Sequence, residues 1–143
     1  MKISTRGRYA VCVMVDLAEH NSGEYIPLAD IARRQGISGK YLETIVAMLV
    51  KNEMLTAIRG KGGGYRLTKR PEEYSVASIL KVTEGSFAPV DGLENGKNQC
   101  GGFEYRKTQK LWEDLQALID NYLENITLED LLDNEISADN YII

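Results

Sequence analysis

The sequence predicts a mainly α-helical protein built as a winged helix-turn-helix with a long C-terminal helix. Two short amphipathic segments meet at Gly36 with the spacing of a helix-turn-helix, and a glycine-rich hairpin at residues 59–65 follows them as a wing. Charge is divided as well: residues 1–70 hold twelve Lys and Arg against six Asp and Glu, while residues 71–143 hold five against fifteen. The net +6 of the first part indicates a surface for a polyanion, although a chain with unevenly solvated charge is an alternative.

Apolar residues recur at helical spacing in three segments of the first half. The expected helices are Thr5–His20, Leu28–Gln35 and Lys40–Asn52. Ser4 and Ser38 are suited to accept hydrogen bonds from backbone N–H groups of the first turns, and Pro27 lacks the N–H that a first turn leaves unused. Cys12 falls inside the first of these helices and is expected in its buried core.

After these three helices the sequence predicts the hairpin of the wing and then the elements of the second half of the chain. Two short strands are expected on either side of the wing loop, and Pro71 then opens a linker. The remaining elements are strands at Thr56–Ile58 and Tyr65–Thr68, a helix at Val76–Thr83, a loop at Gly85–Gly102, a long helix at Tyr105–Glu124, and a short helix at Leu128–Leu132 that Thr127 and Asp130 cap. The chain divides into a winged helix-turn-helix domain at 1–70, a linker helix and loop at 71–102, and a long helix with tail at 103–143.

The turn between the second and third helices needs a small contact residue, a left-handed bend and a shared apolar core. Ala32 is small enough for the helices to approach, and Gly36 permits the left-handed backbone of the bend. The apolar residues spaced to face the shared core are Ile31, Ile37, Leu42 and Ile45. An ordinary helical hairpin is the alternative.

The loop Arg59–Tyr65 sets two cations, Arg59 and Lys61, among four glycines at a hairpin tip. Glycines let the backbone approach a partner closely, and an arginine there fits a narrow minor groove, where negative potential is enhanced. A nucleotide phosphate loop is disfavoured, because the Walker pattern needs Gly-Lys-Ser/Thr before a helix and Lys61 is followed by Gly62 and a strand. A plain flexible hairpin is the remaining alternative.

The residues left outside the apolar face of the third helix lie at its N-terminal end, the part of a recognition helix that reaches base edges. They are Gly39, Lys40, Tyr41, Glu43 and Thr44. Glu43 is suited to accept a hydrogen bond from a cytosine amino group, with a simply solvated glutamate as the alternative. Arg6, Arg8 and Tyr9 on the first helix are candidate phosphate contacts, and Tyr9 is equally compatible with the core.

The long helix carries two apolar stripes. Leu111, Leu115, Leu118 and Tyr122 repeat at alternating steps of four and three, the seam of a helix pair, and Trp112, Ile119, Leu123 and Ile126 line a neighbouring stripe. Two stripes need two surfaces, so we expect one to pack on its own chain and one on a partner subunit. The predicted dimerisation residues are Leu111, Trp112, Leu115, Leu118 and Tyr122. An entirely intramolecular core is the alternative.

Composition disfavours several other classes. The sequence has no run of eighteen apolar residues, and its N-terminus lacks the apolar stretch of a signal peptide, so a cytoplasmic location is expected. In that compartment Cys12 and Cys100 are not expected to form a structural disulfide. An enzyme is the least supported class, because the chain has one histidine, His20, and no nucleophile–base spacing.

Several motifs taken together carry a resemblance. They are Met1–Ala10, Leu28–Ser38, Tyr41–Glu43, Arg59–Tyr65, Leu111–Leu115 and Ile126–Leu131. In this combination the chain resembles the Rrf2 family of bacterial transcription regulators over about residues 1–133. The resemblance implies a homodimeric repressor on a palindromic promoter site. It matches Ser38, Lys40, Tyr41 and Glu43 to the family's base-reading positions and Arg59 to its wing arginine.

Several family members hold an iron–sulfur cluster through three closely spaced cysteines before the long helix, because thiolates are soft, charged ligands for iron. The resemblance places the last cysteine six residues before Trp112, where this chain has Arg106. With Cys100 as the one cysteine of that region, no cofactor is expected. A cluster with unusual ligands, such as Asp91 or Glu94, is the alternative.

Two other features could receive the signal that controls the regulator. Cys100 is a candidate redox thiol, because its loop is glycine-rich and Lys97 nearby favours the thiolate, with an incidental loop cysteine as the alternative. The cysteine-metabolism repressors of the family respond to a partner enzyme, O-acetylserine thiol-lyase, and the resemblance implies a metabolic enzyme of this kind as a partner here. The acidic tail ending in Asp139–Ile143 is either a partner surface or a frayed end.

For the function as a whole, the last alternative is a protein-interaction module whose helix-turn-helix no longer reads DNA.

Overall fold

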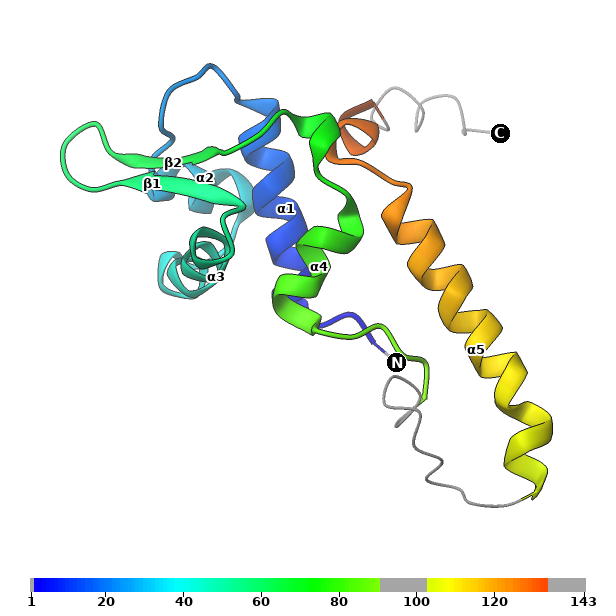
Figure 1. Ribbon diagram of the computed structural model, residues 1–143. Helices are drawn as coiled ribbons and strands as arrows, with labels where there is room; N and C mark the ends of the chain where they lie inside the picture. The colour runs from blue at the N-terminus through cyan, green and yellow to red at the C-terminus, as the bar shows by residue number, and fades with distance from the viewer. Residues whose placement is uncertain (1, 91–102, 134–143) are drawn as a thin grey trace, which may run out of the picture.

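The computed structural model describes residues 2–90 and 103–133 and has a winged-helix architecture (Figure 1). Its elements are α1 (Thr5–Glu19), α2 (Leu28–Gln35), α3 (Gly39–Lys51), β1 (Leu55–Ile58), β2 (Gly64–Leu67), a 3-10 turn (Pro71–Glu73), α4 (Val76–Glu84), α5 (Phe103–Glu124) and a short helix at residues 128–133. The N-terminal half of α5 projects away from the other helices. The predicted fold class is confirmed, and each predicted helix is present with ends within two residues of the expected ones.

Local side-chain caps fix where the helices begin. Ser4 accepts a hydrogen bond from the Gly7 N–H, and Ser38 accepts one from the Tyr41 N–H, as predicted. Thr127 and Asp130 form the reciprocal pair expected before the short last helix, with N···O distances of 2.9 and 3.1 Å. These contacts satisfy N–H groups that the first turn of a helix leaves without backbone partners.

The larger core lies among α1, α2, α3 and the sheet. Gly36 ends α2 in the left-handed conformation, with φ 65° and ψ 31°, and so lets the chain turn sharply into α3. The four residues predicted for the shared core are all buried there: Ile31, Ile37, Leu42 and Ile45. Leu128 also belongs to this core, and its N–H donates to the Tyr74 carbonyl, which ties the segment after α5 to the segment just before α4.

Cys12 corrects one expectation. The sequence analysis placed it in the core of the first helix, but the structure places it on the exposed face of α1. The buried residues of α1 include Ala10, Met14 and Leu17, and at 100° per residue position 12 lies on the opposite side of the helix. Cys12 is therefore not a packing residue.

Asp16 is the buried charged residue of the described part of the chain, with 1% of its side chain exposed. Arg34 at the end of α2 donates to both carboxylate oxygens, from Nε at 3.0 Å and from Nη2 at 2.7 Å. Gln35 adds a third hydrogen bond of 2.8 Å. Burial alone raises the pKa of the Asp16 carboxyl, but the hydrogen bonds from Arg34 and Gln35 and the charge of Arg34 hold that pKa below its ordinary value.

We expect acid to remove the stability that Asp16 contributes. Because its pKa is lower in the folded than in the unfolded chain, the carboxylate stabilises the fold above the unfolded value of about 4, and this contribution is lost as the pH falls through the lower folded value. Asp16→Asn should lower the free energy of unfolding at pH 7 by about 1.5–3 kcal/mol, because a buried amide cannot accept all the hydrogen bonds that Arg34 and Gln35 donate to the carboxylate. Urea unfolding followed by circular dichroism between pH 7 and pH 2 measures both effects.

The matched control is Glu24→Gln, which removes an exposed carboxylate of the same domain. It should leave the unfolding curve close to that of the unmodified protein at every pH. An Asp16→Asn variant that is as stable as the unmodified protein at pH 7 would contradict the role assigned to Asp16.

Candidate nucleic-acid interface

One face of α3 is free of packing contacts with the core. Lys40, Tyr41, Glu43 and Thr44 are exposed there, as the sequence pattern indicated. Two further exposed residues, Ala47 and Lys51, continue the same face by one and two helical turns, and the sequence analysis missed them. Glu43, Thr44, Ala47, Met48 and Lys51 together line a shallow depression along the helix.

The wing is the loop between β1 and β2, and glycines shape it. Gly60 and Gly62 have φ of 95° and 80°, values that favour glycine, and the Gly63 N–H donates to the Gly60 carbonyl at 2.9 Å. Arg59 and Lys61 are both exposed on this loop. The wing therefore presents two cations on a tightly turned backbone.

The hairpin is fixed to the chain before α2 at the end where its strands meet the wing loop. Ile26 and Tyr65 exchange two backbone hydrogen bonds of 2.9 and 2.8 Å. Gly64 makes this approach possible, because a β-carbon there would overlap the Ile26 carbonyl. Arg66 donates to the Gly23 carbonyl at 2.7 Å and stacks on the Tyr25 ring at 4.4 Å.

A buried tyrosine fixes the base of the same hairpin, at the end opposite to the loop. The Tyr74 hydroxyl accepts hydrogen bonds from the Thr68 and Lys69 N–H groups at 2.8 and 3.0 Å and donates to the Met54 carbonyl at 2.9 Å. Both strands are thus tied to the residue that precedes α4. The wing is held in place relative to α3 at each end of its sheet.

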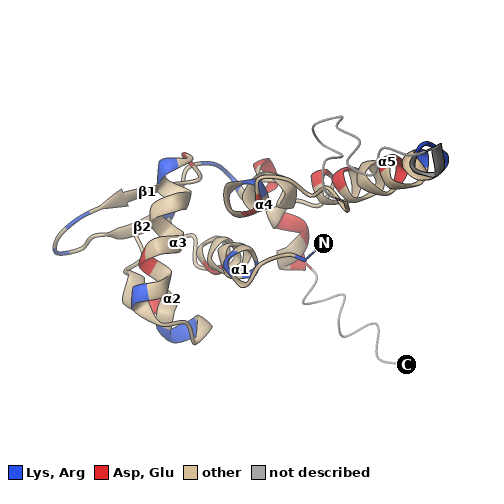
Figure 2. Ribbon diagram, turned by 90° about the horizontal axis from the view of Figure 1, so that it is seen from below, with Lys and Arg blue, Asp and Glu red and all other residues tan. Residues whose placement is uncertain are grey.

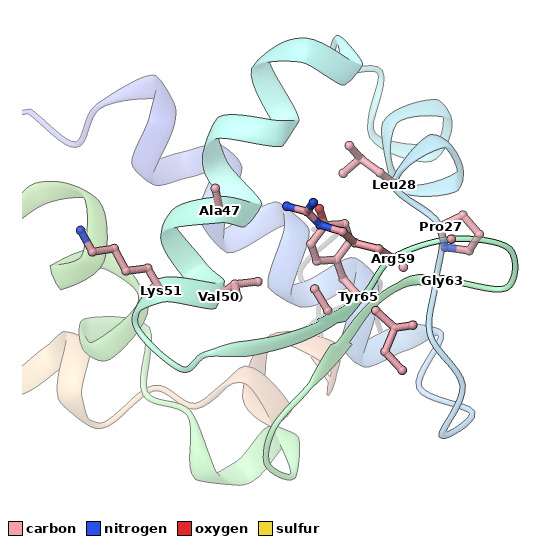
Figure 3. Close-up of a pocket in the computed structure, with 12 residues that line it drawn as sticks. Pro27, Leu28, Ala47, Val50, Lys51, Arg59, Gly63 and Tyr65 are labelled. Carbon is pink, nitrogen blue, oxygen red and sulfur yellow. The ribbon is translucent and has the colours of Figure 1, made fainter.

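A groove of about 580 Å³ separates α3 from the wing (Figure 3). Its lining residues are Pro27, Leu28, Ala47, Val50, Lys51, Ala57, Ile58, Arg59, Gly60, Gly63, Gly64 and Tyr65. The Arg59 side chain extends from the start of the wing loop, just after β1, across this groove toward α3. Ile58 is 50% exposed at its edge. The groove joins the exposed face of α3 and the wing into one continuous surface.

Charge follows this surface. Lys and Arg lie on the wing loop, on α2 and on α3, and Asp and Glu recur along α5, whose far end also carries Lys and Arg (Figure 2). The excess of Lys and Arg in residues 1–70 thus lies on the winged-helix part of the molecule. The basic side coincides with the exposed face of α3 and with the wing, where a polyanion would be attracted.

The three predicted residues of α1 lie at its first turns. Arg6 and Arg8 are exposed, and Arg8 donates to the Thr5 hydroxyl at 3.2 Å. Tyr9 is half-buried against the core, and its ring meets the Tyr41 ring edge-on, with centroids 5.7 Å apart and planes at 80°. This contact joins α1 to the N-terminal end of α3.

The two stripes of α5 have different surroundings. Ile119, Leu123 and Ile126 pack against a second, smaller core formed by Val76, Ala77, Leu80 and Phe87. The seam residues Leu111, Leu118 and Tyr122 are 58, 67 and 65% exposed, and Leu115 and Trp112 are half-buried. An apolar groove beside the seam is lined by Ile3, Phe87, Leu118, Ile119, Tyr122 and Leu123. The C-terminal part of one stripe, from Ile119 on, is thus covered by the chain itself.

The residues named as sensing candidates lie outside the described part of the chain: Asp91 and Glu94 as unusual cluster ligands, Cys100 as a redox thiol, and Lys97 as the cation that favours its thiolate. The tail at 139–143 lies outside it as well. In residues 2–90 and 103–133 no group of three or more His, Cys, Asp or Glu side chains is arranged to hold a metal ion. In the same part of the chain, none of the helices has the length and apolar character needed to cross a membrane.

A recognition helix, a glycine-shaped basic wing and a basic surface that joins them define a winged-helix DNA-binding regulator. The comparison with protein families agrees. Residues 3–134 match the Rrf2 family, described as iron-dependent transcriptional regulators, and this chain belongs to that family.

Similar proteins include regulators named IscR and CymR. The HTH-type transcriptional regulator IscR of Pectobacterium atrosepticum is 40% identical over 136 residues, which cover 94% of this chain and 81% of that protein. The structure of CymR, the global cysteine regulator of B. subtilis, superposes with a TM-score of 0.76. The two sequences are 34% identical, and the match covers 92% of this chain and 95% of the CymR chain. IscR of T. potens is 33% identical, covers 96% and 90%, and has a TM-score of 0.75.

Proposed function

We propose that this Rrf2-family regulator is a homodimeric repressor that binds a palindromic promoter site. The observation that carries the proposal is the exposed face of α3, which lies beside a basic wing held at both ends of its hairpin. In this proposal α3 enters the major groove, and residues 1–70 act as the DNA-binding domain. A dimer bound across a promoter would exclude other proteins from the same stretch of DNA.

The contacts divide by chemistry. Lys40, Tyr41, Glu43 and Thr44 reach base edges from the start of α3, and Glu43 accepts a hydrogen bond from a cytosine amino group. Ser38 caps α3 with its side chain and is exposed beside these residues. Arg59 enters the minor groove, while Arg6, Arg8, Tyr9 and Lys61 meet phosphates, which position the protein without specifying sequence.

The dimer is proposed to form along α5. Leu111, Leu118 and Tyr122 form a row of largely exposed apolar side chains on the face away from α4, with Trp112 and Leu115 beside them. Pairing of two such rows removes this surface from water, which is the main driving force of association. Two copies related by a two-fold axis would place their α3 helices in successive major grooves.

The donor set does not fit an iron–sulfur cluster of the three-cysteine kind. The chain has two cysteines, and Cys12 lies on the exposed face of α1. At the position that the family resemblance gives to the last ligand stands Arg106, whose cationic side chain cannot replace a thiolate. We therefore propose that the regulator acts without a cluster and that its signal arrives by another route, with a metabolic enzyme such as O-acetylserine thiol-lyase as one partner to test.

Substitution of the wing arginine tests groove reading. An operator is first selected from random duplexes with the unmodified protein. Arg59→Ala should weaken operator binding by about 1–3 kcal/mol and have a smaller effect on random duplexes, because a groove contact discriminates between sequences. Lys61→Ala should weaken both alike and lower the salt slope by about one, as expected for a phosphate contact. Fluorescence anisotropy titrations at several salt concentrations give these values. Equal losses on both DNAs for Arg59→Ala would contradict the wing role.

Substitution of the seam tests the dimer. Leu118→Glu places a charge in the proposed interface and should shift the protein toward a monomer in light scattering coupled to size exclusion, with a large loss of operator affinity. Ala117→Glu adds the same charge on an exposed position of α5 outside the seam and should leave the dimer intact. A Leu118→Glu protein that stays dimeric would contradict the proposed interface.

Anaerobic purification tests the absence of a cluster. The expected product is colourless and contains neither iron nor sulfide in stoichiometric amounts. Cys100→Ser should then keep its operator affinity with and without oxidant. Stoichiometric iron with visible absorbance would contradict the proposal, and an oxidant effect that Cys100→Ser abolishes would show a redox thiol instead.

A further inference from the structure

The carboxylate of Glu84, the last residue of α4, lies at the N-terminus of α1. Its Oε1 accepts hydrogen bonds from both the backbone N–H and the hydroxyl of Ser4, each at 2.7 Å. The Ser4 hydroxyl oxygen in turn accepts the Gly7 N–H at 3.0 Å. Gly7 is required for this approach, because a β-carbon there would overlap the Glu84 carboxylate.

This contact joins two segments eighty positions apart in the sequence. A carboxylate at a helix N-terminus is stabilised by the helix dipole, and here it also satisfies backbone and cap donors of the first turn. The Arg6 guanidinium adds a long contact to the Thr83 carbonyl, at 3.5 Å, from the same turn. The beginning of α1 is thereby held against the end of α4.

The turn that Glu84 holds is the one that carries the proposed DNA contacts of α1. Arg6 and Arg8 project from it, and Tyr9 follows with its ring against Tyr41 of α3. A shift of this turn would move both cations and would loosen the ring contact that supports the start of the recognition helix. Glu84 itself carries a negative charge, so it is not a phosphate contact.

We propose that Glu84 is a positioning residue for DNA binding, which holds the first turn of α1 so that Arg6, Arg8 and Tyr9 meet the operator in a fixed arrangement. The proposal rests on the proposed function, since it needs α1 to lie against DNA. Without Glu84 the binding-competent arrangement is only partly populated, and DNA must restore it at a cost in apparent affinity.

Because Glu84 is negatively charged, a positioning role and a purely electrostatic role predict opposite changes in operator affinity when it is removed. Removal of a carboxylate near a DNA-facing surface reduces repulsion, so on electrostatics alone every DNA should bind equally well or better. A positioning role predicts the opposite for the operator. A loss of operator affinity together with unchanged or stronger binding to random duplexes therefore separates positioning from charge.

The experiment compares two substitutions that remove the same charge. Glu84→Ala also removes the hydrogen-bond acceptor, and we expect its operator affinity to fall by about tenfold, the effect of a competent state populated to about one tenth. Glu84→Gln keeps an oxygen that accepts from Ser4 and should lose less. Glu72→Gln, in the 3-10 turn and paired with Arg70, is the charge-matched control and should behave like the unmodified protein. Anisotropy titrations with operator and random duplexes are read beside thermal unfolding curves.

A steric test approaches the same contact from the other side. Gly7→Ala should displace the Glu84 carboxylate and lower operator affinity as Glu84→Ala does. In the Glu84→Ala background the added methyl group no longer meets that carboxylate and retains only the tight 3.0 Å approach to the Thr83 hydroxyl oxygen, so Gly7→Ala should have a smaller effect there than in the unmodified protein. This pattern does not arise if Gly7→Ala only weakens the fold.

The outcomes are separable. If the unmodified protein selects no operator, the proposed function fails before Glu84 is tested. If it selects one, and Glu84→Ala and Glu84→Gln both bind it at least as tightly as the unmodified protein, the positioning role is wrong. Independent, additive losses from Gly7→Ala and Glu84→Ala would overturn it as well.

Discussion

The orientation of the recognition helix depends on one buried carboxylate. Asp16 is almost fully removed from water, and a charge in that position is tolerated only when hydrogen bonds replace its hydration. The last turn of α2 supplies three of them, from Arg34 and Gln35. Only the short turn centred on Gly36 then separates this anchored turn from α3, so the direction of α3 follows from the position of α2 on α1.

The wing obeys a similar constraint by different means. A two-stranded sheet is marginally stable by itself and needs contacts with the rest of the fold. Here the Ile26–Tyr65 pair holds one end and the Tyr74 hydroxyl holds the other. Because the hairpin is fixed at both ends, Arg59 stays beside α3 while the loop beyond it consists largely of glycine. The helix and the wing therefore act as one surface.

Local pattern predicted the elements but not the contacts that orient them. Periodicity identified Ile31 and Leu42 as core residues, because an apolar stripe at helical spacing has few other uses. The same rule misjudged Cys12, a small apolar residue on the outer side of its helix. Asp16 and Glu84 escaped notice because their partners lie 18 and 80 positions away, and no local signal records such pairs.

The exposed face of α3 could likewise be predicted only in part from the sequence. The exposed positions at the start of α3 followed from the helix pattern, whereas Ala47 and Lys51 became part of the surface only when the wing was placed beside them. Their neighbours across the groove come from β1 and β2, whose position depends on Tyr74 and Ile26. A surface shared between elements needs the tertiary fold before its members can be named.

The arrangement of α5 connects the proposed dimer with the proposed DNA-binding surface. Ile119 and Leu123 pack on the core of α4, so the C-terminal half of α5 has a fixed place on its own chain, and the Lys81–Glu124 ion pair of 3.0 Å lies at the same junction. The N-terminal half projects from the body, and most helices in proteins gain their stability from the packing of an apolar face. Burial of the exposed seam in the proposed dimer would therefore order the projecting half and fix the spacing of two α3 helices at once. Because α4 contacts α5 at Lys81 and α1 at Glu84, a change in how the proposed dimer packs has a direct physical route to the first turn of α1.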